Sequence, residues 1–424
     1  MKYYLTILLP AMICHTLCAQ HRFGDARQLS HKEEQVFSTP VIYKDNILFA
    51  GMSGRVYAVD KKTGAAKWSG ALSGGIATHL VISGDLLLMG SYDGHYYALD
   101  ARNGKQLWKF RTGGEKRIGA KGLWTMKPDT MYMEDQYDLY LSSPATDGAS
   151  VYFGSSDSCI YALDKNNGKL RWKFNTGGPV HAGVTCAQGI VLAGSWDTYV
   201  YALDAATGKQ LWKFKTKEDT VYHHVLEGIQ AQPVVAGNTV YIGARDARLY
   251  ALDLHTGNKR WEYSAGDAWI VGAAVVTNGH VYVGTSDSYL MLDIDAATGK
   301  ELHRHKGGGY VFGAPALSGT ALCYGDFTGR LYLLNTNDWN QVDTFDTPGR
   351  KQLAAQLLDG DGRINFKHLA AGADGALFST TLAVMEKLYQ LAPFATTPVT
   401  EENTVYAVTA AGTLYRIALT ANGK

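Results

Sequence analysis

Short runs in which apolar and polar residues alternate recur along most of the chain. Residues 180–214 show them most clearly, as "VHAGVTC" (180–186), "IVLAGSW" (190–196), "YVYALD" (199–204) and "KQLWKF" (209–214). Alternation with a period of two predicts β-strands, and the Gly, Asp and Asn residues between the runs predict tight turns. This part of the chain is therefore predicted to form a unit of four strands.

The same unit is repeated along the chain, and most copies lie about 40 residues apart, a period typical of β-propeller blades. A last copy at 394–419 supplies only three strands, and residues 20–25 resemble the missing fourth strand. We therefore predict an all-β, eight-bladed β-propeller, closed by an N-terminal strand that completes the last blade.

Each copy also contains a tight turn followed by a tryptophan, as in "ALDAATGKQLW" (202–212). The aspartate can accept hydrogen bonds from nearby backbone N–H groups, and the glycine can adopt a positive φ. The tryptophan is large enough to fill the gap between two blades, and its N–H can donate one hydrogen bond. We expect this structural docking role for Trp68, Trp108, Trp172, Trp212 and Trp261, with the turn aspartates Asp60, Asp100, Asp164, Asp204 and Asp253. The sixth and seventh copies have His303 and Asp343 at the tryptophan position.

Two segments interrupt the repeat, at about 113–140 and 346–393. We interpret both as insertions into a single propeller domain that spans residues 20–424. Within the second insertion, residues 379–392 predict a helix because their apolar residues recur at helical spacing. Its apolar face is predicted to hold Leu382, Met385, Tyr389 and Ala392, with Ser379 or Thr380 as the N-cap.

The first nineteen residues, 1–19, differ from the rest of the chain. They form an almost uncharged apolar run that ends in Ala19, which predicts a secretory signal peptide. A membrane anchor is the alternative, but the run is short and Pro10 interrupts it. Cys14 and Cys18 each follow a large apolar residue, where a lipid-acceptor cysteine needs a small one. We expect an exported protein in the periplasm or at the outer-membrane periphery, soluble rather than lipid-anchored.

The charge balance argues against nucleic acid as a partner. The chain has 40 basic and 39 acidic residues and a formal net charge of +1, without the basic excess of nucleic-acid-binding proteins. We expect a monomer.

The run A-x-D-x-x-T-G-K-x-x-W is similar to the tryptophan-docking motif of the PQQ-like β-propeller repeat, named after pyrroloquinoline quinone (PQQ). It is intact at 202–212 and nearly intact at 98–108, 162–172 and 251–261. The resemblance covers nearly all of the chain after residue 20. It implies the propeller fold, but the repeat is shared by quinone-dependent dehydrogenases and by scaffolds without enzymatic activity.

Two branches of this repeat family offer different functions. The BamB family of outer-membrane assembly factors resembles the chain in length, export signal and blade number. It implies a non-enzymatic scaffold that binds protein partners in the cell envelope, such as a component of the β-barrel assembly machinery, with no cofactor. The quinoprotein dehydrogenases are longer and carry two adjacent cysteines, whereas Cys159, Cys186 and Cys323 are far apart here. The alternative is a propeller that binds PQQ with Ca²⁺ or another small ligand, as a quinoprotein-type oxidoreductase does.

A few residues are candidates for contacts with a ligand or a partner. Histidines that precede the first strands of blades four and five are expected near the axis, where ordinary polar packing is the alternative role. Basic residues and a tryptophan of the first insertion could meet an anion, although such a loop is often simply solvated. The candidates are Arg117, Trp124, His181, His223, His224 and Trp269. We assign no catalytic residue and expect no metal site.

Overall fold

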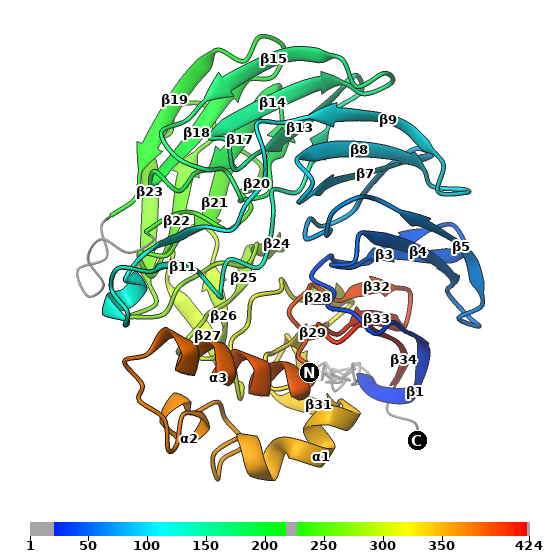
Figure 1. Ribbon diagram of the computed structural model, residues 1–424, viewed down its shortest axis with the longest axis vertical. Coiled ribbons are helices and arrows are strands. Elements are labelled where there is room, and N and C mark those ends of the chain that lie inside the picture. The colour runs from blue at the N-terminus through cyan, green and yellow to red at the C-terminus, as the bar shows by residue number, and fades with distance from the viewer. Residues whose placement is uncertain (1–20, 218–226, 422–424) are drawn as a thin grey trace, which may run out of the picture.

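The computed structural model describes residues 21–217 and 227–421. These residues form eight four-stranded antiparallel sheets that surround a common axis, as Figure 1 shows. The predicted eight-bladed propeller is therefore confirmed. The expected signal peptide and the candidates His223 and His224 lie outside the described residues.

The blades follow one another in chain order, and each begins at the axis and ends at the outer rim. The strands of blades one to four are β2 (Val41–Tyr43), β3 (Asn46–Ala50), β4 (Arg55–Asp60), β5 (Ala66–Ala71), β6 (Val81–Ser83), β7 (Leu86–Ser91), β8 (His95–Asp100), β9 (Gln106–Arg111), β12 (Ala145–Thr146), β13 (Ser150–Gly154), β14 (Cys159–Asp164), β15 (Leu170–Asn175), β16 (Thr185–Ala187), β17 (Ile190–Gly194), β18 (Tyr199–Asp204) and β19 (Gln210–Lys215). The strands of blades five to seven are β20 (Val234–Ala236), β21 (Thr239–Gly243), β22 (Arg248–Asp253), β23 (Lys259–Ser264), β24 (Val275–Thr277), β25 (His280–Gly284), β26 (Leu290–Asp295), β27 (Glu301–Lys306), β28 (Ala316–Ser318), β29 (Ala321–Gly325), β30 (Arg330–Asn335) and β31 (Gln341–Asp346).

The eighth blade joins the two ends of the described chain. It contains β32 (Val399–Glu401), β33 (Thr404–Val408), β34 (Thr413–Ala421) and, at its outer edge, β1 (His21–His31). β1 pairs with β34 antiparallel, from His21 opposite Ala421 to His31 opposite Thr413. The predicted closing strand is thus confirmed, and it is longer than expected.

The innermost strands are shorter than the sequence pattern indicates. In blade four the expected first strand at 180–186 is reduced to β16, and residues 180–184 form a loop that runs toward the axis. Val180, Ala182 and Val184 of this loop are buried, so alternation there reflects packing at the axis rather than strand pairing.

The hydrophobic core lies between neighbouring blades. β17 is buried along its whole length, because blades cover both of its faces. Leu192 and Ala202 of blade four, for example, share one apolar cluster with Val240 and Leu252 of blade five. Burial of such residues on both faces of each sheet stabilises the ring of blades.

Each regular joint between blades consists of an indole and a glycine. Trp172 of blade three donates its Nε1–H to Ala205 O of blade four at 3.0 Å. Its ring lies against Gly208, where an added Cβ would approach Trp172 to 2.6 Å, and Gly208 has a φ of 73°. The turn therefore needs glycine both for its backbone conformation and for this contact. The other four indole–glycine pairs are Trp68 with Gly104, Trp108 with Gly168, Trp212 with Gly257 and Trp261 with Gly299.

The joint between blades six and seven is also filled by an indole, but here the indole comes from the turn of the following blade instead of from the preceding blade. Trp339 takes the glycine place in the turn of blade seven, with a φ of 57°. Its ring stacks on His303 of blade six, with centroids 5.6 Å apart and planes at 20°. The indole that is missing from blade six is thus supplied by its neighbour. Between blades seven and eight, Asp343 accepts a hydrogen bond from the N–H of Phe23 in β1 at 3.1 Å.

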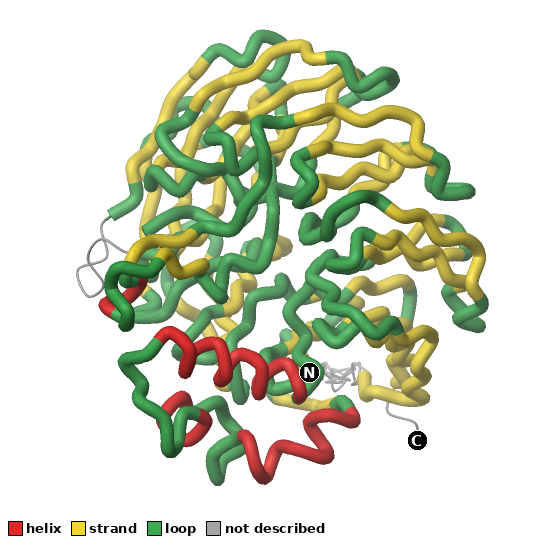
Figure 2. The backbone as a smooth tube through the Cα atoms, in the orientation of Figure 1, coloured by secondary structure: helices red, strands yellow, loops and turns green. Residues whose placement is uncertain are grey.

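The two insertions lie on one side of the ring and contact each other. The first contains β10 (Gly119–Lys121), the 3₁₀ turn η1 (Leu123–Thr125) and β11 (Tyr132–Glu134), and the second contains α1 (Pro348–Leu357), α2 (Phe366–Leu369) and α3 (Phe378–Gln390). Figure 2 shows the helices gathered at one edge of the propeller. Lys127 N–H donates to Ala376 O at 2.7 Å, and Phe378 N–H donates to Lys127 O at 3.0 Å. Within the described ranges, no helix is long and apolar enough to cross a bilayer.

The helix predicted at 379–392 is confirmed as α3. Its predicted cap is wrong, and its predicted apolar face is right for Met385 and Tyr389, which pack into the core, but wrong for Leu382. The N-cap is Leu377, without a side-chain cap, and Thr380 Oγ1 donates instead to Asp374 O at 2.6 Å. Leu382 is exposed, whereas Val384, Met385 and Leu388 are buried. The buried stripe begins at Phe378 and Thr381, one helical position away from the stripe expected from Leu382.

Candidate functional site

Residues 135–141 of the first insertion, which we call the axial segment, run across the axis of the propeller. Leu141 N–H donates to Ala77 O before blade two at 3.1 Å, and the Tyr140 hydroxyl donates to Ala395 O before blade eight. Tyr137 packs against Tyr310 before blade seven, with ring centroids 5.5 Å apart. One short segment therefore touches loops from distant parts of the ring, so it crosses the axial channel.

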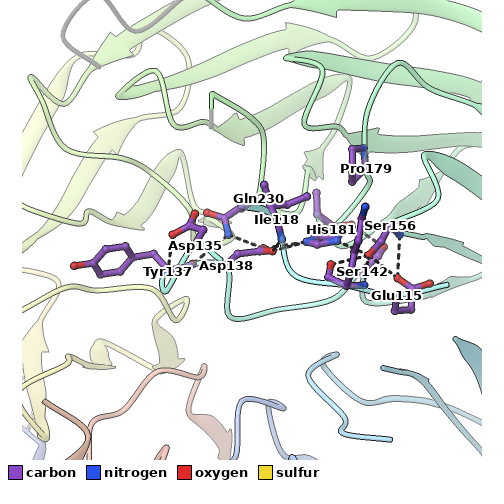
Figure 3. A network of polar contacts seen from close by, with 12 residues as sticks. Glu115, Ile118, Asp135, Tyr137, Asp138, Ser142, Ser156, Pro179, His181 and Gln230 are labelled. Carbon is purple, nitrogen blue, oxygen red and sulfur yellow. Dashed lines mark hydrogen bonds and ion pairs between the residues drawn. The ribbon is translucent and has the colours of Figure 1, made fainter. Parts of the chain in front are cut away.

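A buried polar chain anchors the first insertion to blades three and four (Figure 3). His181 Nδ1 lies 2.9 Å from Asp138 Oδ1, and His181 Nε2 lies 2.7 Å from Ser156 Oγ. Ser156 Oγ in turn donates to Glu115 Oε2 at 2.9 Å. Asp138 also accepts from Ile118 N–H at 2.7 Å. Glu115 and Asp138, at the two ends of this chain of contacts, belong to the first insertion, as does Ile118. Ser156 and His181 of the blades therefore hold the insertion at two points.

The protonation of this pair follows from its burial and charges. Burial alone would lower the pKa of His181, but attraction by Asp138 and its hydrogen bond raise the pKa above the ordinary value. Burial also opposes the charge on Asp138, yet His181 and the Ile118 N–H group together lower the Asp138 pKa. The geometry therefore favours a charged pair, imidazolium with carboxylate.

The order Ser156–His181–Asp138 resembles that of a catalytic triad, but the serine is already engaged. Its Oγ also lies 3.0 Å from Lys116 O and accepts from Lys116 N–H at 3.0 Å. His181 is 2% exposed, and both of its ring nitrogens are engaged by Asp138 and Ser156. A nucleophilic serine needs a free face beside its base, and this arrangement instead holds the insertion in place.

A second buried contact fixes the axial segment through Arg245 of blade five. Arg245 Nη1 lies 2.6 Å from Asp135 Oδ2, an ion pair whose angle is not that of a hydrogen bond, and Arg245 Nε donates to Gln230 Oε1 at 2.7 Å. The guanidinium also lies between two indoles, 4.6 Å from the centroid of Trp196 and 4.1 Å from that of Trp269. Burial raises the pKa of Asp135 despite the attraction of Arg245.

Arg245 was not among the residues selected from sequence, although its position in the repeat is informative. It directly precedes the aspartate that follows the second strand of its blade. The same place holds Ser156 in blade three, Trp196 in blade four and Ser286 in blade six. All of these residues face the axis on the side of the insertions, so alignment of the copies by this aspartate would have found them.

An open cavity of about 520 Å³ lies where the two insertions meet blades five to seven. Its lining residues are Trp124, Met126, Tyr137, Asp267, Trp269, Ser286, Asp287, Tyr310, Phe312, Phe366, Gly375 and Thr381. The expected candidates Trp124 and Trp269 thus come together here, with centroids 6.2 Å apart. Two other candidates lie elsewhere: His181 is in the buried polar chain, and Arg117 is half-buried beside Tyr92.

A smaller cavity of about 230 Å³ lies on another side of the axial segment. His79, Tyr140, His181 and Gln232 are among its lining residues. Burial lowers the pKa of His79 to about 4, and Thr39 N–H donates to its Nδ1 at 3.2 Å. The channel therefore holds a neutral histidine as well as a charged one.

The chain was compared with known proteins. The family described as "Outer membrane protein assembly factor BamB" matches three overlapping stretches, residues 24–146, 119–264 and 196–352. The chain belongs to this family.

Individual relatives are distant. BamB of Pseudomonas aeruginosa is 37% identical over 60 residues, which is 14% of this chain and 16% of that protein's own length. The crystal structure of BamB from Moraxella catarrhalis has a TM-score of 0.65 at 19% identity, covering 93% of this chain and all of that one. The computationally designed protein Ika8 is similar as well, with a TM-score of 0.64 at 16% identity, covering 93% and 98% of the two chains. At these identities the two structures show the shared fold alone.

The residues around the open cavity do not fit PQQ. PQQ carries carboxylate groups, and the charged lining residues Asp267 and Asp287 would repel them. The nearest guanidinium, Arg245, is sealed between two indoles and paired with Asp135. Within residues 21–217 and 227–421, no group of three or more His, Cys, Asp or Glu side chains is placed to hold a metal ion.

Proposed function

We propose that this protein is an exported, non-enzymatic binding scaffold of the cell envelope that takes part in outer-membrane protein assembly. Membership of the BamB family supports this role. The observation that carries the proposal is that the protein's own chain crosses the axial channel and engages Asp138 and Asp135 there in buried contacts with His181 and Arg245. Binding surfaces then lie on the outside of the ring.

The outer edges of blades two, three and four are the surface we assign to a partner. The outermost strands β9, β15 and β19 expose Leu107, Leu170 and Leu211 to 49%, 47% and 48%. Leu107 and Leu211 occupy the same position, directly before the docking tryptophan, whereas Leu170 stands one residue earlier in its strand. Three large apolar side chains at such exposure on successive blades mark this side of the ring for contact with a partner. In β9 and β19 the leucine stands at a bulge in the pairing, which turns it outward.

The chemistry of these edges suits an extended polypeptide. An outermost strand has one row of backbone N–H and C=O groups without a neighbouring strand, and an extended segment can pair with it. Exposed Lys109, Lys173 and Lys213 follow the docking tryptophans on the same strands. We therefore expect a partner segment with apolar side chains next to acidic ones.

Location and assembly state are part of the proposal. We expect cleavage after Ala19, a mature monomer in the periplasm, and no lipid anchor. Fractionation of cells and mass determination of the mature N-terminus check this. A mature chain that starts at Cys18 with an added lipid mass contradicts it.

Co-purification from envelope extract tests the scaffold role. The wild-type chain should recover a component of the β-barrel assembly machinery, identified by mass spectrometry. The combined variant Leu107→Ser, Leu170→Ser and Leu211→Ser should recover about tenfold less, because central apolar contacts dominate such interfaces. Its thermal unfolding should match the wild type, since surface substitutions change stability little.

The matched control is Leu377→Ser with Leu382→Ser, two exposed leucines of the second insertion. This control should recover the component as the wild type does. Equal recovery with the edge variant would overturn the assigned surface. A wild-type chain that recovers no assembly component would contradict the proposed function itself.

A further inference from the structure

We propose that the open cavity between the two insertions binds a small organic cation of the alkylammonium class, either free or as the head of a methylated lysine side chain. The cavity lies apart from the outer edges assigned to the protein partner, and its argument does not depend on that function. Three features of the cavity support the proposal: the arrangement of its aromatic rings, the charges of its lining residues and the segments of the chain that supply them.

Aromatic rings form the walls: Tyr310 and Phe312 stack on each other at 21°, whereas Trp124, Tyr137 and Trp269 meet at larger angles. Trp124 and Trp269 are tilted by 38°, and Tyr137 lies edge-on to Trp269 at 79°, with centroids 6.1 Å apart. Tyr137 lies 5.6 Å from Trp124 and is nearly perpendicular to Tyr310, at 81°. Rings at such angles present faces to a shared space, and a cation within about 6 Å of a ring centroid is attracted to its face.

The charged groups of the lining are both acidic. Asp287 and Asp267 come from the loops on either side of β24 and β25, and the lining contains no lysine, arginine or histidine. Arg245 contacts the ring of Trp269, but it is 1% exposed and is paired with Asp135. The field inside the cavity therefore favours a positive ligand.

Asp287 is placed to act as the counter-ion. Its side chain is accessible through the cavity, yet surrounding protein atoms raise its pKa. It accepts one hydrogen bond, from Ser286 Oγ at 2.9 Å. A carboxylate that lines an open cavity gains from a cation beside it.

The volume of the cavity and the segments that line it also fit such a ligand. A volume of about 520 Å³ falls in the range of small-ligand pockets, about 300–1,000 Å³, so an ammonium head and the body that carries it both have room. Trp124 and Tyr137 come from the first insertion, and Phe366 and Thr381 come from the second. The site is therefore built jointly by the two insertions and by blade loops that carry Trp269 and Asp287.

Calorimetric titration of the full chain with choline tests the proposal. Choline should bind with saturation, whereas its neutral isostere 3,3-dimethylbutan-1-ol should bind at least about tenfold more weakly, because it has the same shape without the charge. A short peptide that carries trimethyllysine forms the second arm. Tighter binding of the peptide than of choline identifies a protein-borne head, and the reverse identifies a free ligand.

Asp287→Asn keeps the shape of the side chain and should weaken choline binding about tenfold. The matched control is Asp25→Asn, an exposed aspartate on β1 outside the cavity lining, which should leave binding unchanged. Equal affinity for the neutral isostere, or failure of both ammonium probes to bind with saturation, overturns the proposal. Displacement of choline by PQQ overturns it as well, because a carboxylate-rich quinone would then share the site.

Discussion

The ring of blades and the two insertions hold together in different ways. In the ring, one contact is used again and again: an indole from one blade on the glycine turn of the next, as with Trp172 and Gly208. In the insertions, each contact occurs once, and the main ones join buried charges, as with Asp135 and Arg245. Because the same contact is repeated around the ring, we expect the loss of one copy to disturb the ring only locally. Each contact of the insertions occurs once, so no second copy can replace it.

The comparison also shows how the ring handles exceptions. Where blade six lacks its indole, Trp339 supplies one from the opposite side of the same joint. In blade eight the outer strand β1 comes from the other end of the described chain, so no turn connects it to β34. There the Phe23 N–H group of β1 donates to Asp343 of blade seven. The space between these neighbouring blades is therefore filled in each case, although different residues fill it.

The largest effect is expected where the insertion meets the ring. Arg245→Ala leaves Asp135 buried without its partner and opens a space between Trp196 and Trp269. Removing one member of a buried ion pair costs about 3–5 kcal/mol, so the free energy of unfolding should fall by about 4 kcal/mol. Urea denaturation measures it.

The control for that variant is Arg248→Ala, because Arg248 is 26% exposed and only loosely contacts Glu262. It should cost less than about 1 kcal/mol. A loss from Arg245→Ala as small as the control's would mean that the charge contact does not hold the axial segment.

A regular joint of the ring should show the next largest effect. Trp212→Ala removes a buried ring and its hydrogen bond to Leu254 O at 2.9 Å, and should cost about 3–4 kcal/mol. At the exceptional joint, Trp339→Gly should cost about 3 kcal/mol for the same reason.

Combining Trp339→Gly with His303→Trp should rebuild a regular joint between blades six and seven. The double variant is expected to recover about 1–2 kcal/mol relative to Trp339→Gly alone, as neighbouring residues couple. Asp293 keeps His280 as a partner at 2.8 Å when His303 is replaced. Additive losses in denaturation experiments would show that the two positions do not serve one joint.

A smaller effect should appear with pH at His79, which packs against Tyr140 of the axial segment at a centroid distance of 5.3 Å. The folded state keeps His79 neutral down to about pH 4, whereas the unfolded chain takes up a proton below about 6.5. The free energy of unfolding should therefore fall as the pH is lowered between these values. His79 is partly exposed to the adjoining cavity, so we expect a loss of only about 1–2 kcal/mol.

His79→Asn is the comparison for this prediction, because it keeps a hydrogen-bond acceptor but does not titrate. Denaturation curves of the two proteins, followed from about pH 7 to about pH 4.5, should diverge steadily. Parallel curves would show that the axial segment does not shield His79.

The sequence predicts the ring well and the insertions poorly, for a physical reason. The turn, the glycine and the tryptophan of each blade are close in sequence, so local patterns such as 202–212 reveal them. The partners Asp138 and His181 are brought together only by the path of the chain across the axis. The sequence offers Trp124 with the basic residues of the first insertion and Trp269 as a separate candidate, but their common cavity depends on how the first insertion packs against the loop between β23 and β24. The exposed Leu382 in α3 shows the same limit, since helical periodicity does not decide which face meets the propeller.

Hydrogen exchange of the axial segment tests the central claim, that the protein's own chain plugs the propeller axis, most directly. Asp135 N–H donates to Ile118 O at 2.8 Å and Leu141 N–H donates to Ala77 O, so these amides should exchange as slowly as those of β13 and β14. In Arg245→Ala, exchange in 135–141 should accelerate while β17 and β18 remain protected. Rapid exchange of residues 135–141 in the wild-type protein, at the rate of exposed turns, would contradict the claim.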